Sequence, residues 1–186
     1  MIFRRKKINP YKATLYAIYN VKQGMSRIEA LMDRIKNRRR RMLEIAAQLE
    51  MRGETFLAKK YASEIAKLDK IHSRLADLRL VLEKIVLSLE YAMTLHNFKG
   101  IAKEVLNLTN ELKKLPEATI PDIGLLFANL ESTLRSLEAS SYEIPDISYP
   151  SIMEDYGDSE KILMEAREIV KKKLETELAV SNDNNY

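Results

Sequence analysis

Residues 51–55 read MRGET, a short turn signal between two long helical patterns. Gly53 supplies the conformational freedom that a tight turn requires. On both sides of the turn, apolar residues recur every three or four positions over about 40 residues, the period of an amphipathic helix. Two such helices form an antiparallel hairpin about 60 Å long, because each residue adds about 1.5 Å. The sequence therefore predicts an all-α fold built on one long antiparallel hairpin, with shorter helices packed on it or extended from it.

The composition supports a helical protein and excludes several classes. Only five Gly and five Pro occur in 186 residues, and 31% of the residues are charged. There is no Cys, so disulfides and thiolate metal sites are excluded. No apolar run reaches the roughly 18 residues that a membrane span needs. The start, MIFRRKKI, has positive charge but no apolar stretch behind it, so we do not expect it to be a secretory signal.

The two helical patterns carry apolar stripes whose steps alternate between three and four, near the coiled-coil repeat of about 3.5 residues. The first stripe is Leu15, Ile18, Val21, Met25, Ile28, Met32, Ile35, Met42, Ile45 and Leu49. The second stripe is Tyr61, Ile65, Leu68, His72, Leu75, Leu78, Leu82, Ile85, Leu89 and Ala92. We expect His72 to be a packed core residue rather than a ligand. Gly24 weakens the first helix by about 1 kcal/mol.

Shorter helices are expected after the hairpin. The stretch LHNFKG, 95–100, weakens the helix and marks a hinge. The hinge residues are His96, Asn97 and Gly100. A short helix from Ile101 to Lys114 ends before Pro116, and an amphipathic helix follows Pro121. Its apolar side holds Ile123, Leu126, Phe127, Leu130, Leu134 and Leu137.

The chain divides into segments of different charge. The expected divisions are a basic, membrane-inserting N-terminal segment (1–10), a helical core (11–140), an acidic proline-containing linker (141–159), a C-terminal regulatory helix (160–180) and a disordered tail (181–186). Residues 1–60 hold 16 Lys and Arg against 5 Asp and Glu, whereas residues 116–186 hold 6 against 15. This asymmetry predicts a basic surface for an anionic partner and an acidic part that lies against it.

Four consecutive arginines, Arg38–Arg41, interrupt the first apolar stripe. Successive residues of a helix point about 100° apart, so at least one of them must lie at or near the apolar seam. With the turn centred in MRGET, Arg38 is expected opposite Asp69. Arg41 is expected opposite Glu64. Two acidic residues cannot neutralise four arginines, so this helix keeps a positive surplus.

The surplus suits either nucleic acid or an anionic membrane. The basic stretch lacks the interleaved aromatic residues of a nucleic-acid platform, which makes nucleic acid the weaker partner. The start, MIFRRKKI, combines apolar and basic residues as membrane-surface segments do, although a frayed terminus is the alternative. The candidate membrane-binding residues are Ile2, Phe3, Arg4, Arg5, Lys6, Lys7, Lys22, Arg34, Arg38, Arg39, Arg40 and Arg41.

Motifs of catalysis and cofactor binding are absent from the sequence. It contains no GxxxxGK[ST], GxGxxG, HExxH or GxSxG motif, and no ExxH pair for a carboxylate metal site. His96 has no acidic or Cys partner at the ligand spacing of a helix. We therefore expect no enzyme activity, no cofactor and no metal site.

Residues 26–75 resemble the helix–turn–helix of the ESCRT-III family. They read SRIEALMDRIKNRRRRMLEIAAQLEMRGETFLAKKYASEIAKLDKIHSRL, and the small residues Ala58, Ala62 and Ala66 follow the turn, where that family's helices approach closely. The order of elements along the chain is also similar, most closely for residues 11–140. The likeness is greatest to archaeal cell-division proteins of the CdvB type. Some proteins of this type carry a winged-helix domain after the tail; with the sequence ending at residue 186, we expect a shorter paralogue that lacks it.

The resemblance implies a non-catalytic membrane-remodelling subunit that acts in cell division or scission. Such subunits form filaments, with themselves and with paralogous subunits, on anionic lipids at the cytoplasmic face of the cell membrane. They switch from a closed form, with the acidic C-terminal part on the basic core, to an open form with a straightened hinge. An AAA ATPase with an MIT domain removes them by binding tail motifs. YEIPDISYP, 142–150, is similar to one such motif, although an ordinary linker is the alternative; the candidate contacts are Ile144, Pro145, Ile147 and Pro150.

Two other functions fit the residues. A basic helical-hairpin module for nucleic acid would bind DNA or RNA in a salt-sensitive way and ignore lipid. A coiled-coil structural adaptor would use the arginines for partner pairing alone and would form a discrete dimer rather than a polymer.

Overall fold

The structure is a computed structural model that describes the backbone of residues 8–139 and 156–183. Within these ranges every regular element is a helix, which confirms the predicted fold class. The chain forms two compact units, Met1–Tyr142 and Glu143–Tyr186, and each is described by itself.

The hairpin consists of α1, Pro10–Met51, and α2, Thr55–Leu95. The Asn9 side chain caps α1 by accepting hydrogen bonds from the backbone N–H groups of Tyr11 and Lys12, at 3.0 and 3.3 Å. At the far end, Gly53 takes a φ of 76°, a left-handed conformation that glycine adopts without strain. The turn is therefore closed by the residue that the sequence indicates.

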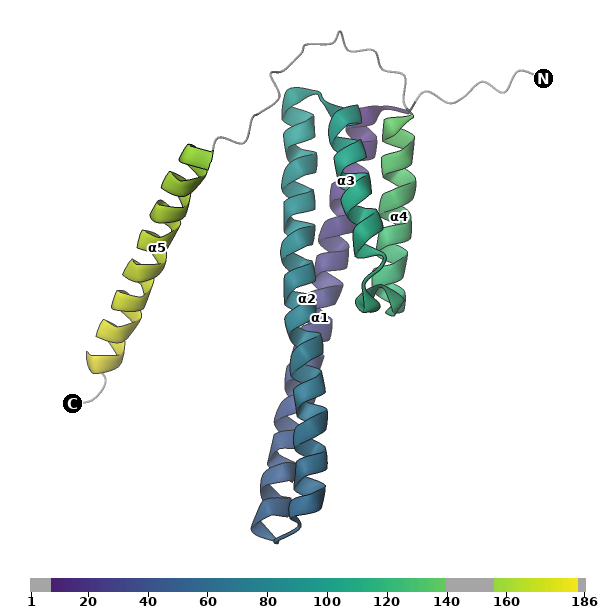
Figure 1. The fold of residues 1–186 in the computed structure, drawn as a ribbon. Helices are drawn as coiled ribbons and strands as arrows, with labels where there is room; N and C mark the ends of the chain where they lie inside the picture. Colours follow the sequence, from purple (N-terminus) through teal and green to yellow (C-terminus); the bar gives the residue numbers. More distant parts are fainter. Residues whose placement is uncertain (1–7, 140–155, 184–186) are drawn as a thin grey trace. The chain divides into compact units, whose positions relative to one another are not determined.

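Three shorter elements double back along the hairpin. They are α3, Phe98–Leu112, the 3₁₀ helix η1, Pro116–Thr119, and α4, Pro121–Glu138. α3 packs on α2 and α4, and α4 also packs on α1 (Figure 1). They cover only the part of the hairpin away from the turn, so the first unit has a four-helix half (10–35 and 75–138) and a two-helix half (36–74).

The core lies in the four-helix half. All six apolar residues predicted on α4 are buried, from Ile123 to Leu137. They meet fully buried residues of α2, such as Leu82 and Ile85, and the apolar side of α3. Gly24 of α1 lies so close to α4 that a Cβ atom there would overlap the side chain of Leu126. This glycine therefore allows the close approach of α1 and α4.

The two-helix half buries little. Its buried residues are Ala46, Ala58 and Ile65, while His72 is half-buried. Of the small residues expected to line the approach of the helices, Ala58 does so, but Ala62 and Ala66 are exposed. Over roughly 25–30 Å of hairpin, at about 1.5 Å per residue, the two helices bury only the single seam between them.

The first apolar stripe was wrong at two positions. Leu15 and Ile45 were expected in the seam, but they are 44% and 39% exposed. Near Ile45 the seam passes through Ala46, which is 9% exposed. Ile45 points about 100° away from Ala46 around the helix, so the seam can bury only one of these two adjacent side chains.

The chain reverses direction at the predicted hinge. α2 ends at Leu95, and His96 adopts a left-handed conformation with a φ of 56°. The Asn97 side chain then caps α3 by accepting a hydrogen bond from the backbone N–H of Gly100, at 3.3 Å. α3 consequently begins at Phe98, before the predicted Ile101.

The second unit contains one described helix, α5, Tyr156–Asp183. It is longer at both ends than the predicted 160–180, and it includes the first part of the predicted tail, 181–186. Residues 141–155 of the predicted linker, 141–159, lie outside the described residues.

Candidate functional site: a basic face of the hairpin

The four consecutive arginines point in different directions, and Arg39 is the one at the seam. It is half-buried, and its Nε donates a hydrogen bond to Oδ1 of Asp69 on α2, at 2.6 Å. The sequence placed Arg38 in the neighbourhood of Asp69 and left open which arginine turns inward; that arginine is Arg39, one residue and about 100° of rotation from Arg38. Glu64 pairs with Lys67, at 2.6 Å, and the expected pair with Arg41 does not form.

A row of arginines follows one side of α1. Arg27, Arg34 and Arg41 are seven residues apart, so they lie on the same side of the helix. Nη1 of Arg27 pairs with Oδ1 of Asp122 at the start of α4, at 3.7 Å. Arg34 lines a cavity of about 170 Å³ together with Asp122. The row therefore starts beside α4 and continues toward the turn, and Arg38, four residues from Arg34, extends it.

A second basic row follows the same face of the hairpin on α2. Lys60, Lys67 and Arg74 are also seven residues apart. Nη1 of Arg74 pairs with Oε1 of Glu117 in η1, at 3.5 Å, and Glu117 is only 7% exposed. Both rows thus begin at the η1–α4 corner, where one carboxylate meets each row, and run toward the turn. We call the uncovered part the basic face, made of Arg34, Arg38, Arg41, Lys60 and Lys67.

The lysines of the basic face were not predicted from the sequence. All the candidate membrane-binding residues predicted from the sequence lie before the turn, and the pattern after the turn predicts only an apolar stripe. The signal was present as Lys60, Lys67 and Arg74 at intervals of seven. That these lysines lie on the same side of the hairpin as the arginines follows only from the contacts of Arg27 and Arg74 with the η1–α4 corner.

The other side of the hairpin carries ion pairs between α1 and α2. Nζ of Lys22 pairs with Glu90 at 3.2 Å, and Nε of Arg79 pairs with Glu29 at 2.6 Å. Lys36 lies on this side, where it lines a cavity of about 370 Å³ with Glu29 and Arg79. Arg40 is four residues from Lys36 and projects to the same side.

The predicted membrane-binding residues of α1 are therefore not all on one face. Arg34, Arg38 and Arg41 lie on the basic face. Lys22 and Arg40 lie on the opposite side, and Arg39 is at the seam. The predicted residues of the N-terminal segment, Ile2, Phe3, Arg4, Arg5, Lys6 and Lys7, lie outside the described residues. So do the predicted tail contacts Ile144, Pro145, Ile147 and Pro150.

Exposed apolar residues accompany the basic face. Ile45 follows Arg41 by one helical turn, and Ile71 follows Lys67 by one turn; they are 39% and 37% exposed. A face that mixes cations with apolar side chains is typical of surfaces that bind at the boundary between lipid headgroups and acyl chains.

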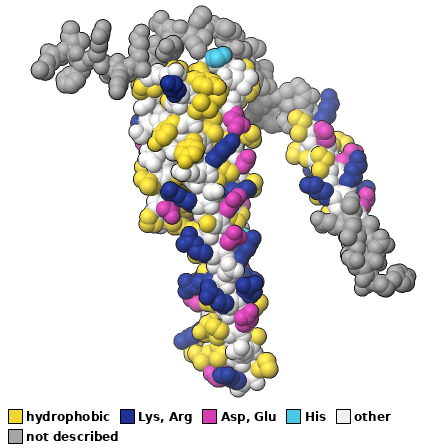
Figure 2. Space-filling model, turned by 180° about the vertical axis from the view of Figure 1, so that it is seen from behind, with side chains coloured by type: hydrophobic (Ala, Val, Ile, Leu, Met, Phe, Trp, Pro, Cys, Tyr) yellow, Lys and Arg dark blue, Asp and Glu magenta, His cyan; other side chains and the backbone are white. Residues whose placement is uncertain are grey.

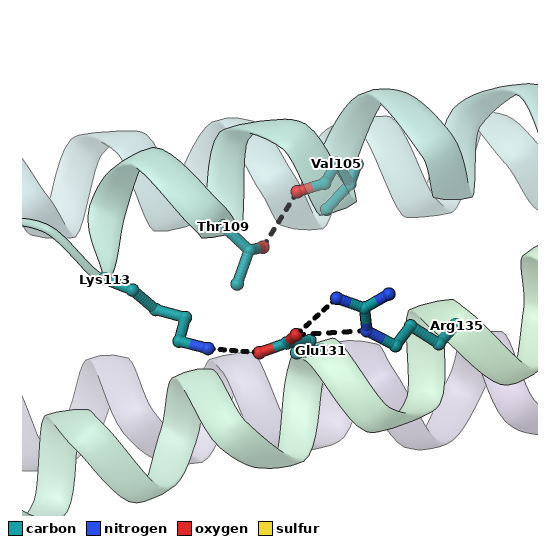
Figure 3. A network of polar contacts seen from close by, with 5 residues as sticks. All are labelled: Val105, Thr109, Lys113, Glu131 and Arg135. Atoms are coloured by element: carbon teal, nitrogen blue, oxygen red, sulfur yellow. Dashed lines mark hydrogen bonds and ion pairs between the residues drawn. The ribbon is translucent and has the colours of Figure 1, made fainter.

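A polar network fastens α3 to α4. Lys113, at the end of α3, forms an ion pair with Glu131 of α4, and Arg135 donates to the same carboxylate at 2.8 and 3.0 Å (Figure 3). The hydrogen bonds from Lys113 and Arg135 lower the pKa of Glu131 from its ordinary value of 4.5. Beside them, the Thr109 hydroxyl donates to the carbonyl of Val105, at 2.8 Å. α3 and α4 are thus joined by charge as well as by their apolar sides.

The described residues hold neither a cluster of metal ligands nor a membrane-spanning helix. No group of three or more His, Asp or Glu side chains there is arranged to hold a metal ion. Within the same residues, no helix combines the length and the apolar character that crossing a membrane requires.

Comparison with known proteins places the chain beside cell division proteins. It is 25% identical over 166 residues to cell division protein B1 of Sulfolobus acidocaldarius, covering 89% of this chain and 77% of that protein. The chain is thus similar to a cell division protein of the B type. Cell division protein B of the same organism is 20% identical over 172 residues, covering 92% of this chain and 65% of that protein. The predicted CdvB-type resemblance is confirmed. No protein-family model and no solved structure matches the chain.

Proposed function

We propose that this B-type relative is a non-catalytic filament subunit of an ESCRT-III-like machinery for cell division or scission. It binds the cytoplasmic face of the cell membrane at the division site, through anionic lipids, and polymerises there with itself and with paralogous subunits. The names of the two relatives support the part in cell division. The hairpin fold and its charged surface support the membrane contact.

The observation that carries this proposal is the basic face. Arg34, Arg38, Arg41 and Lys60 form no ion pair with any described acidic residue, whereas Lys22 and Arg79 on the opposite side are paired across the hairpin. Residues 36–74 as a whole contain eleven Lys and Arg against five Asp and Glu. Each Lys or Arg near an anionic bilayer contributes about 1 kcal/mol of binding free energy.

The test is sedimentation with vesicles of anionic phospholipid, compared with zwitterionic vesicles. Exchanging Arg38→Glu and Arg41→Glu reverses two charges of the basic face. We expect this variant to lose at least about thirtyfold in affinity, since two contacts contribute about 2 kcal/mol. The matched control, Lys36→Glu with Arg40→Glu, changes the net charge equally on the other side of α1. Equal losses in the two variants would show that overall charge, and not the basic face, governs binding.

Nucleic acid is the competing ligand for two rows of cations. Duplex DNA and single-stranded RNA, tested under the same salt conditions as the vesicles, separate the two partners. A protein that binds nucleic acid tightly and vesicles weakly would be the nucleic-acid module instead. A stable dimer that binds neither would be the coiled-coil adaptor.

Polymerisation and removal have their own tests. Deleting residues 141–186 should increase filament formation on anionic vesicles, seen by electron microscopy, because the acidic C-terminal part would no longer compete for the basic face. In the full chain, Pro145→Ala with Ile147→Ala should weaken binding of an MIT-domain ATPase and leave filaments unchanged. Absence of filaments in both forms of the chain would contradict the proposed assembly.

A further inference from the structure

The closed end of the hairpin exposes a group of apolar side chains. Met51, the last residue of α1, is 88% exposed, and Phe56, in the first turn of α2, is 69% exposed. Leu57 beside it is 42% exposed. We call Met51, Phe56 and Leu57 the tip. Yellow side chains gather at this end of the hairpin in the space-filling view (Figure 2).

The local structure holds the tip residues outward. The backbone N–H of Glu54 donates to the carbonyl of Leu49 at 2.9 Å, and Gly53 completes the turn in its left-handed conformation. The chain thus reverses between Met51 and Thr55, and no other described element of this unit reaches this end. The tip is therefore exposed because of its position at the turn, where no described helix of this unit lies to pack against it.

Charge alone does not distinguish the tip. The charged residues next to the tip in the sequence are the cations Arg52, Lys59 and Lys60 and the acids Glu50 and Glu54. Nζ of Lys60 lies 4.7 Å from the centre of the Phe56 ring, so the cation and the ring share one surface. Lys60 is also the last member of the α2 row of the basic face. The tip is therefore the apolar end of a surface that is otherwise cationic.

We propose that the tip inserts Met51, Phe56 and Leu57 into an anionic bilayer, at the boundary between headgroups and acyl chains. This inference rests on the proposed membrane function and adds a second, apolar anchor to it. The tip is a convex end of three side chains, far smaller than the roughly 800 Å² per partner that a stable protein interface buries. Insertion needs no partner groove, and Lys60 can extend its charged end to the headgroups while Phe56 goes deeper.

A single tryptophan provides a direct readout, because the chain contains no Trp. Phe56→Trp places the reporter in the tip, and Leu80→Trp is the control at an exposed α2 position of the four-helix half. On adding anionic vesicles, the emission of the Phe56→Trp variant should shift to the blue and be quenched by lipids brominated on their acyl chains. The Leu80→Trp variant should show neither effect. Substituting Ser for all three tip residues should weaken vesicle binding by at least about tenfold.

The outcomes separate this inference from the proposed function. Vesicles that bind the Phe56→Trp variant while its emission stays unshifted and unquenched would overturn the tip anchor and leave the basic face as the membrane contact. An emission shift that depends on protein concentration and not on lipid would identify a second copy of the chain as the occupant, which also overturns the inference. Failure of the unmodified chain to bind any anionic vesicle would refute both.

Discussion

The two halves of the hairpin share one helical pattern but differ in what covers it. In the four-helix half, α3 and α4 close over the seam, and Leu82 and Ile85 of α2 are fully buried. In the two-helix half the same α2 buries only Ala58 and Ile65. The sequence period is continuous across the boundary. Cover by other helices, not the period, therefore decides where the core lies.

The charges change at the same boundary. Where α3, η1 and α4 lie on the hairpin, Asp122 and Glu117 meet the first members of the two basic rows. Beyond that corner the rows continue without a cover. In the proposed function, the four-helix half supplies stability and the two-helix half supplies the membrane-binding surface.

The largest expected effect compares one residue type at two positions of α2. Ile85→Ala should cost about 4 kcal/mol of unfolding free energy, because Ile85 is fully buried among neighbouring helices. Ile65→Ala should cost about 2 kcal/mol, because the hairpin alone surrounds Ile65 and water can reach the space left behind. Urea unfolding followed by helical circular dichroism measures both. Equal costs would show that the two halves are packed alike.

A smaller effect is expected where α4 meets α1. Gly24→Leu should destabilise the four-helix half by about 1–3 kcal/mol, because the new side chain overlaps Leu126. Hydrogen exchange should show lost protection in α4, while the two-helix half keeps its rates.

The matched control for this variant removes the clash. Leu126→Ala in the Gly24→Leu background makes room for the new side chain and should recover part of the lost stability. No recovery would mean that the glycine serves another purpose than the approach of α4.

Much of the fold could be predicted from the sequence, for reasons that differ by element. The turn at Gly53 and the buried side of α4 follow from local rules of conformation and period. The position of Ile45 did not, because a three-residue step and a four-residue step are equally regular, and only the facing helix selects between them. Arg39 shows the same limit, since its direction depends on the register of α2.

The candidate site was predicted only in part. A long helix with excess arginine indicates an anionic partner, and this needs no tertiary structure. The side of the hairpin on which Arg34 and Arg41 lie is identified only by the ion pair between Arg27 and Asp122, a contact between residues far apart in the chain. Lys60 and Lys67 join the face only because the hairpin folds back on itself.

An acid-dependent effect is expected at Glu131, which joins α3 to α4. Its pKa is lowered in the folded protein by hydrogen bonds from Lys113 and Arg135, so it favours folding at any pH above its ordinary pKa of 4.5. That contribution is lost as the pH falls below 4.5 through the lowered pKa. Glu131→Gln should therefore lower the urea midpoint at about pH 7 and have little effect in strong acid. A difference that is constant with pH would contradict this role.

A modest gain of membrane affinity is expected from the η1–α4 corner. Glu117→Gln with Asp122→Asn removes the carboxylates that meet Arg74 and Arg27, which lengthens both basic rows. Binding to anionic vesicles should increase, up to about tenfold. The control, Glu29→Gln with Glu90→Gln, makes the same charge change on the opposite side and should gain less. Equal gains would assign the effect to net charge.

The smallest effect is expected at Arg39, the arginine that is held at the seam. Arg39→Gln removes one partner of Asp69, and both side chains are more than 40% exposed, so the loss of stability should be about 0.2–1 kcal/mol. Because this guanidinium is engaged between the helices, vesicle binding should fall less than in Arg38→Gln or Arg41→Gln, which carry the same charge change. The direction in which each arginine points would then decide whether it joins the two helices, as Arg39 does, or binds the membrane, as Arg38 and Arg41 do. An equal fall in all three variants would mean that the arginine run acts through its summed charge, whichever side of α1 each residue occupies.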